Sequence, residues 1–147
     1  MPREIQARTP EQLVEVTGVI HDHFFCVDRI MFDQAAGLVT IPFLLPLEEQ
    51  SRRAKNLWLL EKVIVPRVES AMLIYEATGY RLVDTEQVGC YDFNELRYDQ
   101  ERGMIVILTG IPLALEVDVT DVHVVVRIGE KTVDEVSQWQ VGGWLPK

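Results

Sequence analysis

Alternating apolar and polar residues run through most of this 147-residue chain and predict a domain built largely of β-strands. In the segment 113–120, Leu and Val at the odd positions alternate with Ala, Glu, Asp and Thr, as in a strand with one buried face. The segment 122–128 is rich in β-branched residues and predicts a central strand. Further strands are expected near residues 26–32, 37–44, 57–65, 68–77, 88–98 and 104–109, which makes about eight in all.

Residues 10–24 show helical periodicity instead. Thr9 is suited to cap a helix, Pro10 to occupy its first position, and Gln12 to complete a capping box. Apolar residues then recur at helical spacing up to Phe24. One N-terminal amphipathic helix beside about eight strands predicts an α+β fold, mostly antiparallel β, arranged as a sandwich or a partly open barrel.

Two segments are expected to lie outside this regular framework. Residues 47–56 are polar and charged, and predict one or two helical turns or a mobile loop. Residues 77–80 predict a turn. Pro66 is expected to separate the strands at 57–65 and 68–77, because proline cannot donate to a ladder.

A passage of 18 residues nearly repeats itself 66 positions later. Residues 30–47 and 96–113 align without a gap, and 6 of the 18 positions are identical. Each copy holds an aspartate that is followed four positions later by a glycine. An aspartate carboxylate can accept from backbone amides two residues on, and glycine adopts the left-handed backbone that closes a short loop. Each copy therefore predicts a β-hairpin, around 33–37 (Asp33 to Gly37) and around 99–103 (Asp99 to Gly103).

Two explanations of this similarity stay open. An internal duplication would divide the chain into pseudo-repeat halves at about residues 21–80 and 87–147. Alternatively, two independent hairpins share turn residues because loop length selects them. In either case the length predicts a single domain over residues 1–147, with enough chain to bury a core.

Composition excludes several classes of protein. Apolar residues make up 48% and charged residues 25% of the chain, as in an ordinary soluble globular domain. No run of about 18 uncharged apolar residues is present, so no membrane span is expected. The N-terminal residues lack the apolar stretch of a secretory signal, which predicts a cytoplasmic protein. Cys26 and Cys90 are then expected to be buried free thiols.

Charge gives the first indication of a partner. The net charge is −9, with −3 over residues 1–80 and −6 over residues 81–147. Such a surface repels phosphate backbones, so no nucleic-acid partner is expected. Nine acids and two arginines lie between positions 84 and 121. This asymmetry predicts a basic protein partner, with Asp92, Glu95 and Glu101 as candidate contact residues.

The tail at 132–147 holds two of the three tryptophans, Trp139 and Trp144, around a Gly-Gly pair. In one interpretation the tail is a flap that closes the core of its own chain. In the other its aromatic residues dock on a second subunit, since aromatic side chains concentrate at interface cores. Trp139 and Trp144 are therefore candidate partner-binding residues, and a homo-oligomer is expected.

The one cluster with the character of a metal site is His21-Asp22-His23, to which His123 or Asp121 could add a ligand. Histidines two positions apart share a face on a strand but diverge on a helix. Because the predicted helix reaches this cluster, a role in ending the helix or entering the next strand is favoured over metal binding. Motifs for phosphate binding or nucleophilic catalysis are not recognised, and no cofactor is expected.

These observations predict a non-catalytic soluble binding or assembly module, with an acidic surface that meets a protein partner or a second copy of the chain. The alternative is a metal- or small-ligand-binding protein, or an enzyme, that uses His21, His23 and His123. A half-closed barrel around an apolar ligand is a third interpretation, and it rests on the expected fold alone.

Overall fold

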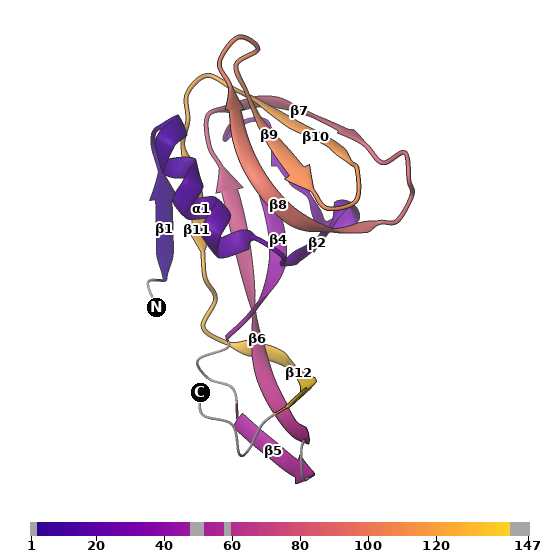
Figure 1. The fold of residues 1–147 in the computed structure, drawn as a ribbon. Helices are drawn as coiled ribbons and strands as arrows, with labels where there is room; N and C mark the ends of the chain where they lie inside the picture. Colours follow the sequence, from indigo (N-terminus) through magenta and orange to yellow (C-terminus); the bar gives the residue numbers. More distant parts are fainter. Residues whose placement is uncertain (1–2, 48–51, 58–59, 142–147) are drawn as a thin grey trace.

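The computed structural model describes residues 3–47, 52–57 and 60–141, and describes side chains outside 53–61 and 138–141. These residues form one α-helix, two 3-10 helices and twelve strands (Figure 1). In chain order they are β1 (Glu4–Ala7), η1 (Pro10–Gln12), α1 (Leu13–Ile20), β2 (Phe24–Cys26), η2 (Val27–Arg29), β3 (Met31–Asp33), β4 (Leu38–Pro46), β5 (Arg52–Leu57), β6 (Leu60–Ile74), β7 (Ala77–Val83), β8 (Cys90–Asp99), β9 (Met104–Thr109), β10 (Ala114–Val119), β11 (Val124–Arg127) and β12 (Thr132–Val141).

The strands form two antiparallel sheets. The larger sheet has the order β1–β11–β6–β4–β3, and β5 and β12 also pair with β6. The smaller sheet has the order β2–β8–β9–β10–β7. The predicted strand-rich antiparallel fold with one N-terminal helix is confirmed, but eight strands are too few, since the described residues hold twelve. β1 alternates but has only four residues, which is too short a pattern to recognise, and β5 is polar and charged over most of its length.

The core lies where the two sheets and α1 meet. Phe25 of β2 stacks on Phe93 of β8 with 4.4 Å between ring centroids, and Phe43 of β4 packs edge-on against Phe93 at 5.6 Å. α1 packs against β8, β1 and β11, and its core-facing side carries three buried residues, Leu13, Val16 and Ile20. In the described part of the chain, no helix has the length and apolar character needed to span a bilayer.

α1 is shorter than the predicted helix, because it ends at Ile20 and the chain enters β2 at Phe24. The reason is competition from the sheet. Asp22 has a φ of 67°, and its N–H donates to the carbonyl oxygen of Phe93 on β8 at 2.8 Å. Pairing with β8 therefore outweighs the helical spacing of apolar residues, and the prediction of helix over residues 21–24 is wrong.

β6 is one strand of 15 residues, whereas two strands separated by Pro66 were expected. The Leu47 N–H donates to the carbonyl oxygen of Pro66 at 2.9 Å, so the backbone of Pro66 faces the β4 side of β6. On that side, the β4 ladder ends at Arg67 and the β5 ladder begins at Ile64. Pro66 thus lies between two partner strands, where its missing N–H omits a bond at the end of the β4 ladder and interrupts neither ladder.

The outer half of β6 extends from the body of the molecule between β5 and β12 (Figure 1). We call β5, β12 and residues 60–67 of β6 the arm. Residues 52–57 are therefore a strand, not the expected helical turns or loop. Residues 132–141 of the tail are also a strand, while 142–147 lie outside the described residues. Residues 77–80 begin β7 instead of forming a turn.

The two similar hairpins have the same register. Asp33 and Asp99 each lie opposite the residue five positions further along the chain. Each carboxylate accepts a hydrogen bond at 3.1 Å from the amide three residues on, where two was expected. Gly37 and Gly103 have φ values of 63° and 64°. The hairpins and their turn residues are confirmed, and an internal duplication stays a prediction.

Candidate functional site

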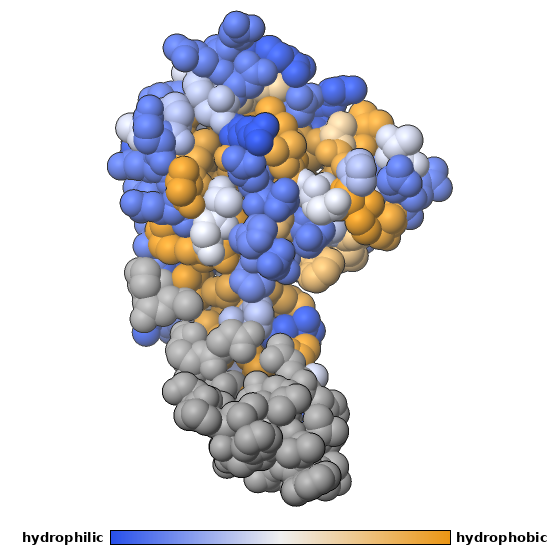
Figure 2. Space-filling model, in the orientation of Figure 1, coloured by the Kyte–Doolittle hydropathy of each residue, from blue (hydrophilic) through white to orange (hydrophobic). Residues whose placement is uncertain are grey.

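A cavity of about 610 Å³ opens where the arm leaves the body, and we call it the groove. It is lined by β2 of the smaller sheet and by β4, β6 and β12 of the larger sheet. Figure 1 shows β2 and β12 on the same side of the molecule, and Figure 2 shows apolar side chains gathered on the body on that side. The lining residues that matter most are Phe24, Pro42, Leu44, Arg67, Glu69 and Val133.

β4 provides an apolar wall of the groove because both of its faces are apolar. The residues at positions 41, 43 and 45 are buried in the core. The alternate residues point to the opposite face, where they are half-buried and line the groove. They are Pro42, Leu44 and Pro46.

The prolines of β4 also account for the opening between β2 and β4. These strands lie close together, but β2 pairs only with β8 in the described residues. Just beyond the last ladder pair of β4 and β6, the Leu47 N–H donates to Pro66, so the odd-numbered residues of β4 bond to β6 and the backbones of Pro42 and Pro46 face away from it. Because proline has no N–H, this edge of β4 cannot form a full ladder with β2.

Two apolar side chains stand exposed beside the groove. Phe24 of β2 is 62% exposed and Val133 of β12 is 49% exposed. Both residues also line the cavity. A cluster of exposed apolar side chains around a cavity is typical of a binding surface, whereas single exposed ones are common everywhere.

Charged residues at the rim of the groove are paired with one another. Arg29 donates to Glu69 at 3.3 Å, and Arg67 donates to both carboxylate oxygens of Asp134 at 2.7 and 2.5 Å. The hydrogen bond from Arg67 holds the pKa of Asp134 below its ordinary value. The same bond raises the pKa of Arg67. A ligand would therefore meet neutralised pairs at the rim and apolar side chains inside.

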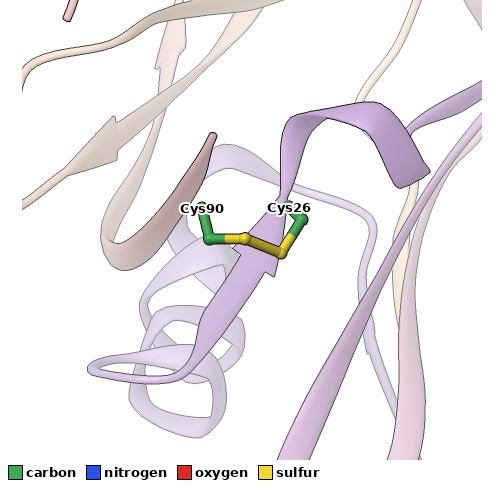
Figure 3. The surroundings of a disulfide bond; sticks show 2 residues. All are labelled: Cys26 and Cys90. Atoms are coloured by element: carbon green, nitrogen blue, oxygen red, sulfur yellow. A yellow bond between two sulfur atoms is a disulfide. The ribbon is translucent and has the colours of Figure 1, made fainter. Parts of the chain in front are cut away.

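Cys26 and Cys90 line the groove and are joined by a disulfide (Figure 3). They lie directly opposite each other in the ladder of β2 and β8. The prediction of buried free thiols is wrong, because the sulfurs are bonded and Cys90 is exposed. A separation of 64 residues gave no sign that these two strands are neighbours. The bond ties the three-residue strand β2, and with it Phe24, to the smaller sheet.

His21 and His23 connect the end of α1 to β8. His21 is the C-cap residue of α1, and its Nδ1 lies 2.9 Å from the carbonyl oxygen of Asn94. Its Nε2 lies 3.4 Å from Oδ1 of Asp22. The carbonyl oxygen of His23 accepts the N–H of Phe93 at 2.9 Å. The expected role in ending the helix is thus seen for His21.

His123 lies between β10 and β11, away from the other histidines in the sequence. Its ring stacks on Tyr75 at 4.6 Å, and its Nδ1 lies 3.1 Å from Nη1 of Arg8. Burial, and then the charge of Arg8, hold the pKa of His123 below its ordinary value. The structure does not join His123 with His21 and His23 in one site: no group of three or more His, Cys, Asp or Glu in the described residues could hold a metal ion.

Asp92 and Glu95 share the outer face of β8, because a bulge between Phe93 and Glu95 shifts the alternation by one residue. Asp92 accepts the N–H of Gly110 at 3.1 Å. Glu95 forms an ion pair with Arg97 at 3.1 Å. Two of the predicted contact residues therefore have partners within the chain.

The remaining predicted contact residues are dispersed. Glu101 is exposed in the turn between β8 and β9. Asp92 lies opposite Phe24 in the ladder of β2 and β8, which makes it the member of the acidic set beside the groove. Trp139 lies on β12 opposite Lys62, but its side chain and the whole of Trp144 lie outside what the structure describes.

Comparisons with protein-family models, with curated proteins and with solved structures give no match for this chain. The site is therefore interpreted from its own geometry. Sequence reasoning missed Phe24, Leu44 and Val133 as site residues. The available signal was Pro42-x-x-x-Pro46 around an apolar run, which indicates a strand edge that is apolar on both faces.

Proposed function

We propose that this protein is a non-catalytic binding module that receives an extended, partly apolar segment of a protein partner in the groove. The observation that supports the proposal is the cavity of about 610 Å³ with Phe24 and Val133 exposed beside it. Full burial of one such side chain contributes about 1.5–3 kcal/mol. Two side chains of this kind can act as the central anchors of an interface, surrounded by contacts that exclude water.

A protein segment fits the groove better than a small molecule does. Phe24 and Val133 expose much of their apolar area to solvent, 62% and 49%, and both line the groove. A small ligand that contacts one of them would leave the apolar area of the other in water. An extended segment can lie along the groove and cover both side chains, with a polar rim around an apolar centre, as in other protein interfaces.

The charge of the chain favours a partner segment with basic residues. Arg29 and Arg67 at the rim are neutralised by Glu69 and Asp134. The carboxylate of Asp22, which also lines the groove, is 75% exposed. The net charge of −9 then attracts basic partners over longer distances, and Asp92, Glu95 and Glu101 are proposed to contribute to this attraction.

Selection from a library of linear peptides about twelve residues long tests the proposal. We expect enriched peptides that combine alternating apolar residues with Lys or Arg. Their affinity should fall at least about tenfold in Phe24→Asp and in Val133→Asp, the equivalent of about 1.4 kcal/mol per site. Val14→Asp and Ile111→Asp are matched controls, since these side chains are 75% and 44% exposed and do not line the groove. Equal affinity for all four variants would contradict the proposal.

The contribution of the acidic residues is tested with the same peptides. Glu95→Gln and Glu101→Gln should slow association and weaken its salt dependence, while dissociation changes little, because rim charges act mainly on the rate of encounter. Association rates that do not respond to these substitutions, at several salt concentrations, would remove the acidic surface from the proposal. The groove would remain as the proposed site in that case.

A cytoplasmic location stays a prediction, and the disulfide of Cys26 and Cys90 favours an oxidising compartment instead, because cytosolic thiols are kept reduced. Mass spectrometry after alkylation without reductant distinguishes the two states in protein taken from its native source. A fully alkylated pair of cysteines would support the cytoplasm, and an unmodified pair would support the oxidising compartment.

A further inference from the structure

Within the part of the chain that the structure describes, β12 is an edge strand along its whole length. It pairs with β6 on one side, and no other strand of the described residues pairs with its opposite side. Its ten residues include neither proline nor lysine. Such an edge is usually guarded by proline, by charged side chains, lysine above all, or by a bulge when a protein remains monomeric. The one register shift in β12 lies at its start, between Thr132 and Asp134, and leaves the remainder regular.

The ladder bonds of β6 show which of its residues face β12. The Tyr75 N–H donates to the carbonyl oxygen of His123 at 2.9 Å, on the side of β11 and β12. On the opposite side, the Leu47 N–H donates to Pro66. Since backbone groups alternate in direction along a strand, the odd-numbered residues of β6 bond to β11 and β12.

The same alternation identifies the outward groups of β12. Asp134 and Val136 lie opposite odd-numbered residues of β6, so their backbone groups are used within the chain. Glu135 and Ser137 therefore direct their N–H and C=O groups away from β6, where a further strand could bind them. Ser137 is exposed, so its side chain does not obstruct that side.

The acids of this edge are already neutralised. Asp134 is paired with Arg67, and Glu135 is paired with Arg52, which reaches it from β5 on the other side of β6. Two copies of the edge can therefore approach each other without the repulsion that a net acidic surface would otherwise produce.

We propose that two copies of the chain pair through β12, antiparallel across a twofold axis at Ser137. This goes beyond the proposed function, because the occupant is a second copy and it binds the backbone edge of the arm. In this register Glu135 faces position 139 of the second copy and Asp134 faces position 140, so no acid faces an acid. Val133 faces Val141, and the two arms form one continuous sheet.

Sedimentation equilibrium of the full chain over a range of concentrations tests this pairing. We expect a mass of twice 16.9 kDa for the wild type and for Ser137→Thr, which keeps the amide. Ser137→Pro should be monomeric, with an unchanged circular dichroism spectrum, because the missing N–H points away from β6. A monomeric wild type, or a folded Ser137→Pro variant that is still dimeric, would overturn the proposal.

Amide hydrogen exchange of the wild type gives a second measurement that does not depend on the folding of a variant. Protection of the Glu135 and Ser137 amides should increase at least about tenfold between dilute and concentrated protein, while that of Val136, bonded within the chain, changes less. Protection that is independent of concentration at Ser137 would also overturn the proposal. Neither measurement involves Phe24, so a negative result for the dimer does not contradict the proposed function of the groove.

Discussion

Cys26 of β2 and Cys90 of β8 lie directly opposite each other in an antiparallel ladder, and their disulfide forms part of the wall of the groove. β2 has only three residues, and Phe24 precedes Cys26 by two positions in it. The covalent bond therefore fixes the strand that presents the proposed main anchor for a partner. Stability and binding are linked through this one short element.

Removal of the disulfide should destabilise the protein. The bond closes a loop with a sequence separation of 64, and loss of such a constraint on the unfolded chain costs about 2–4 kcal/mol. Urea denaturation of the Cys26→Ser/Cys90→Ser double variant measures this difference. The wild type in excess reductant is the control for the substituted side chains. An unchanged urea midpoint in both samples would contradict the assignment of the bond.

The two hairpin glycines should differ in their tolerance of alanine. Left-handed backbone costs an alanine about 1–2 kcal/mol at either position. At Gly37 a Cβ would also lie 3.2 Å from the carbonyl oxygen of Ala77, whereas at Gly103 the nearest atom is 3.7 Å away. The melting temperature of Gly37→Ala in thermal denaturation should therefore be lower than that of Gly103→Ala. Gly18→Ala in α1, where no atom lies within 4 Å, should be neutral or stabilising and serves as control.

His123 should make stability depend on pH near neutrality. Its pKa is lowered in the folded state by burial and by Arg8, so the unfolded chain takes up the proton first. The stabilisation that neutral His123 provides is complete above pH 6.5 or so, since about 6.5 is the ordinary pKa of histidine. This stabilisation is lost as the pH falls through the lowered pKa of the folded state. Chemical denaturation should show a smaller loss of stability on acidification for His123→Phe, which retains an aromatic ring against Tyr75. If the stability of the wild type and of His123→Phe changed equally with pH, the prediction would be contradicted.

Asp134 should make the stability of the protein depend on pH in a more acidic range than His123 does. Its pKa is lowered by the hydrogen bond from Arg67, so the folded state binds this proton less readily than the unfolded chain. The stabilisation is present above the ordinary value of about 3.9 and is lost as pH falls through the lowered pKa. Asp134→Asn should therefore be less stable than the wild type at neutral pH, and the difference should close in acid. A difference that stays constant with pH would show that the pair contributes nothing.

The sequence is sufficient where structure is decided locally. Asp33 and Gly37 specify their turn through a carboxylate that binds a nearby amide and a left-handed backbone, and Asp99 and Gly103 do the same. The start of the helical segment follows equally from Thr9, whose hydroxyl accepts the N–H of Gln12. Each of these interactions lies within four residues, so the pattern contains all the necessary information.

The sequence is insufficient where distant strands decide the outcome. Pro66 reads as a strand break, yet it is tolerated because β4 ends and β5 begins beside it. Phe24 has the spacing of a helical core residue, but the ladder with β8 turns it into an exposed residue of the groove. The pairing of Cys26 and Cys90 depends on the same ladder. Strand order, which no local pattern encodes, controls all three results.

The central claim is that partners bind in the groove between β2, β4 and β12. Titration of isotope-labelled protein with a selected peptide, followed by amide NMR, tests it most directly. We predict chemical-shift changes concentrated at Phe24, Leu44 and Val133, with little change at Val14 on α1. Changes confined to the outer face of β8, or spread evenly over the chain, would contradict the claim.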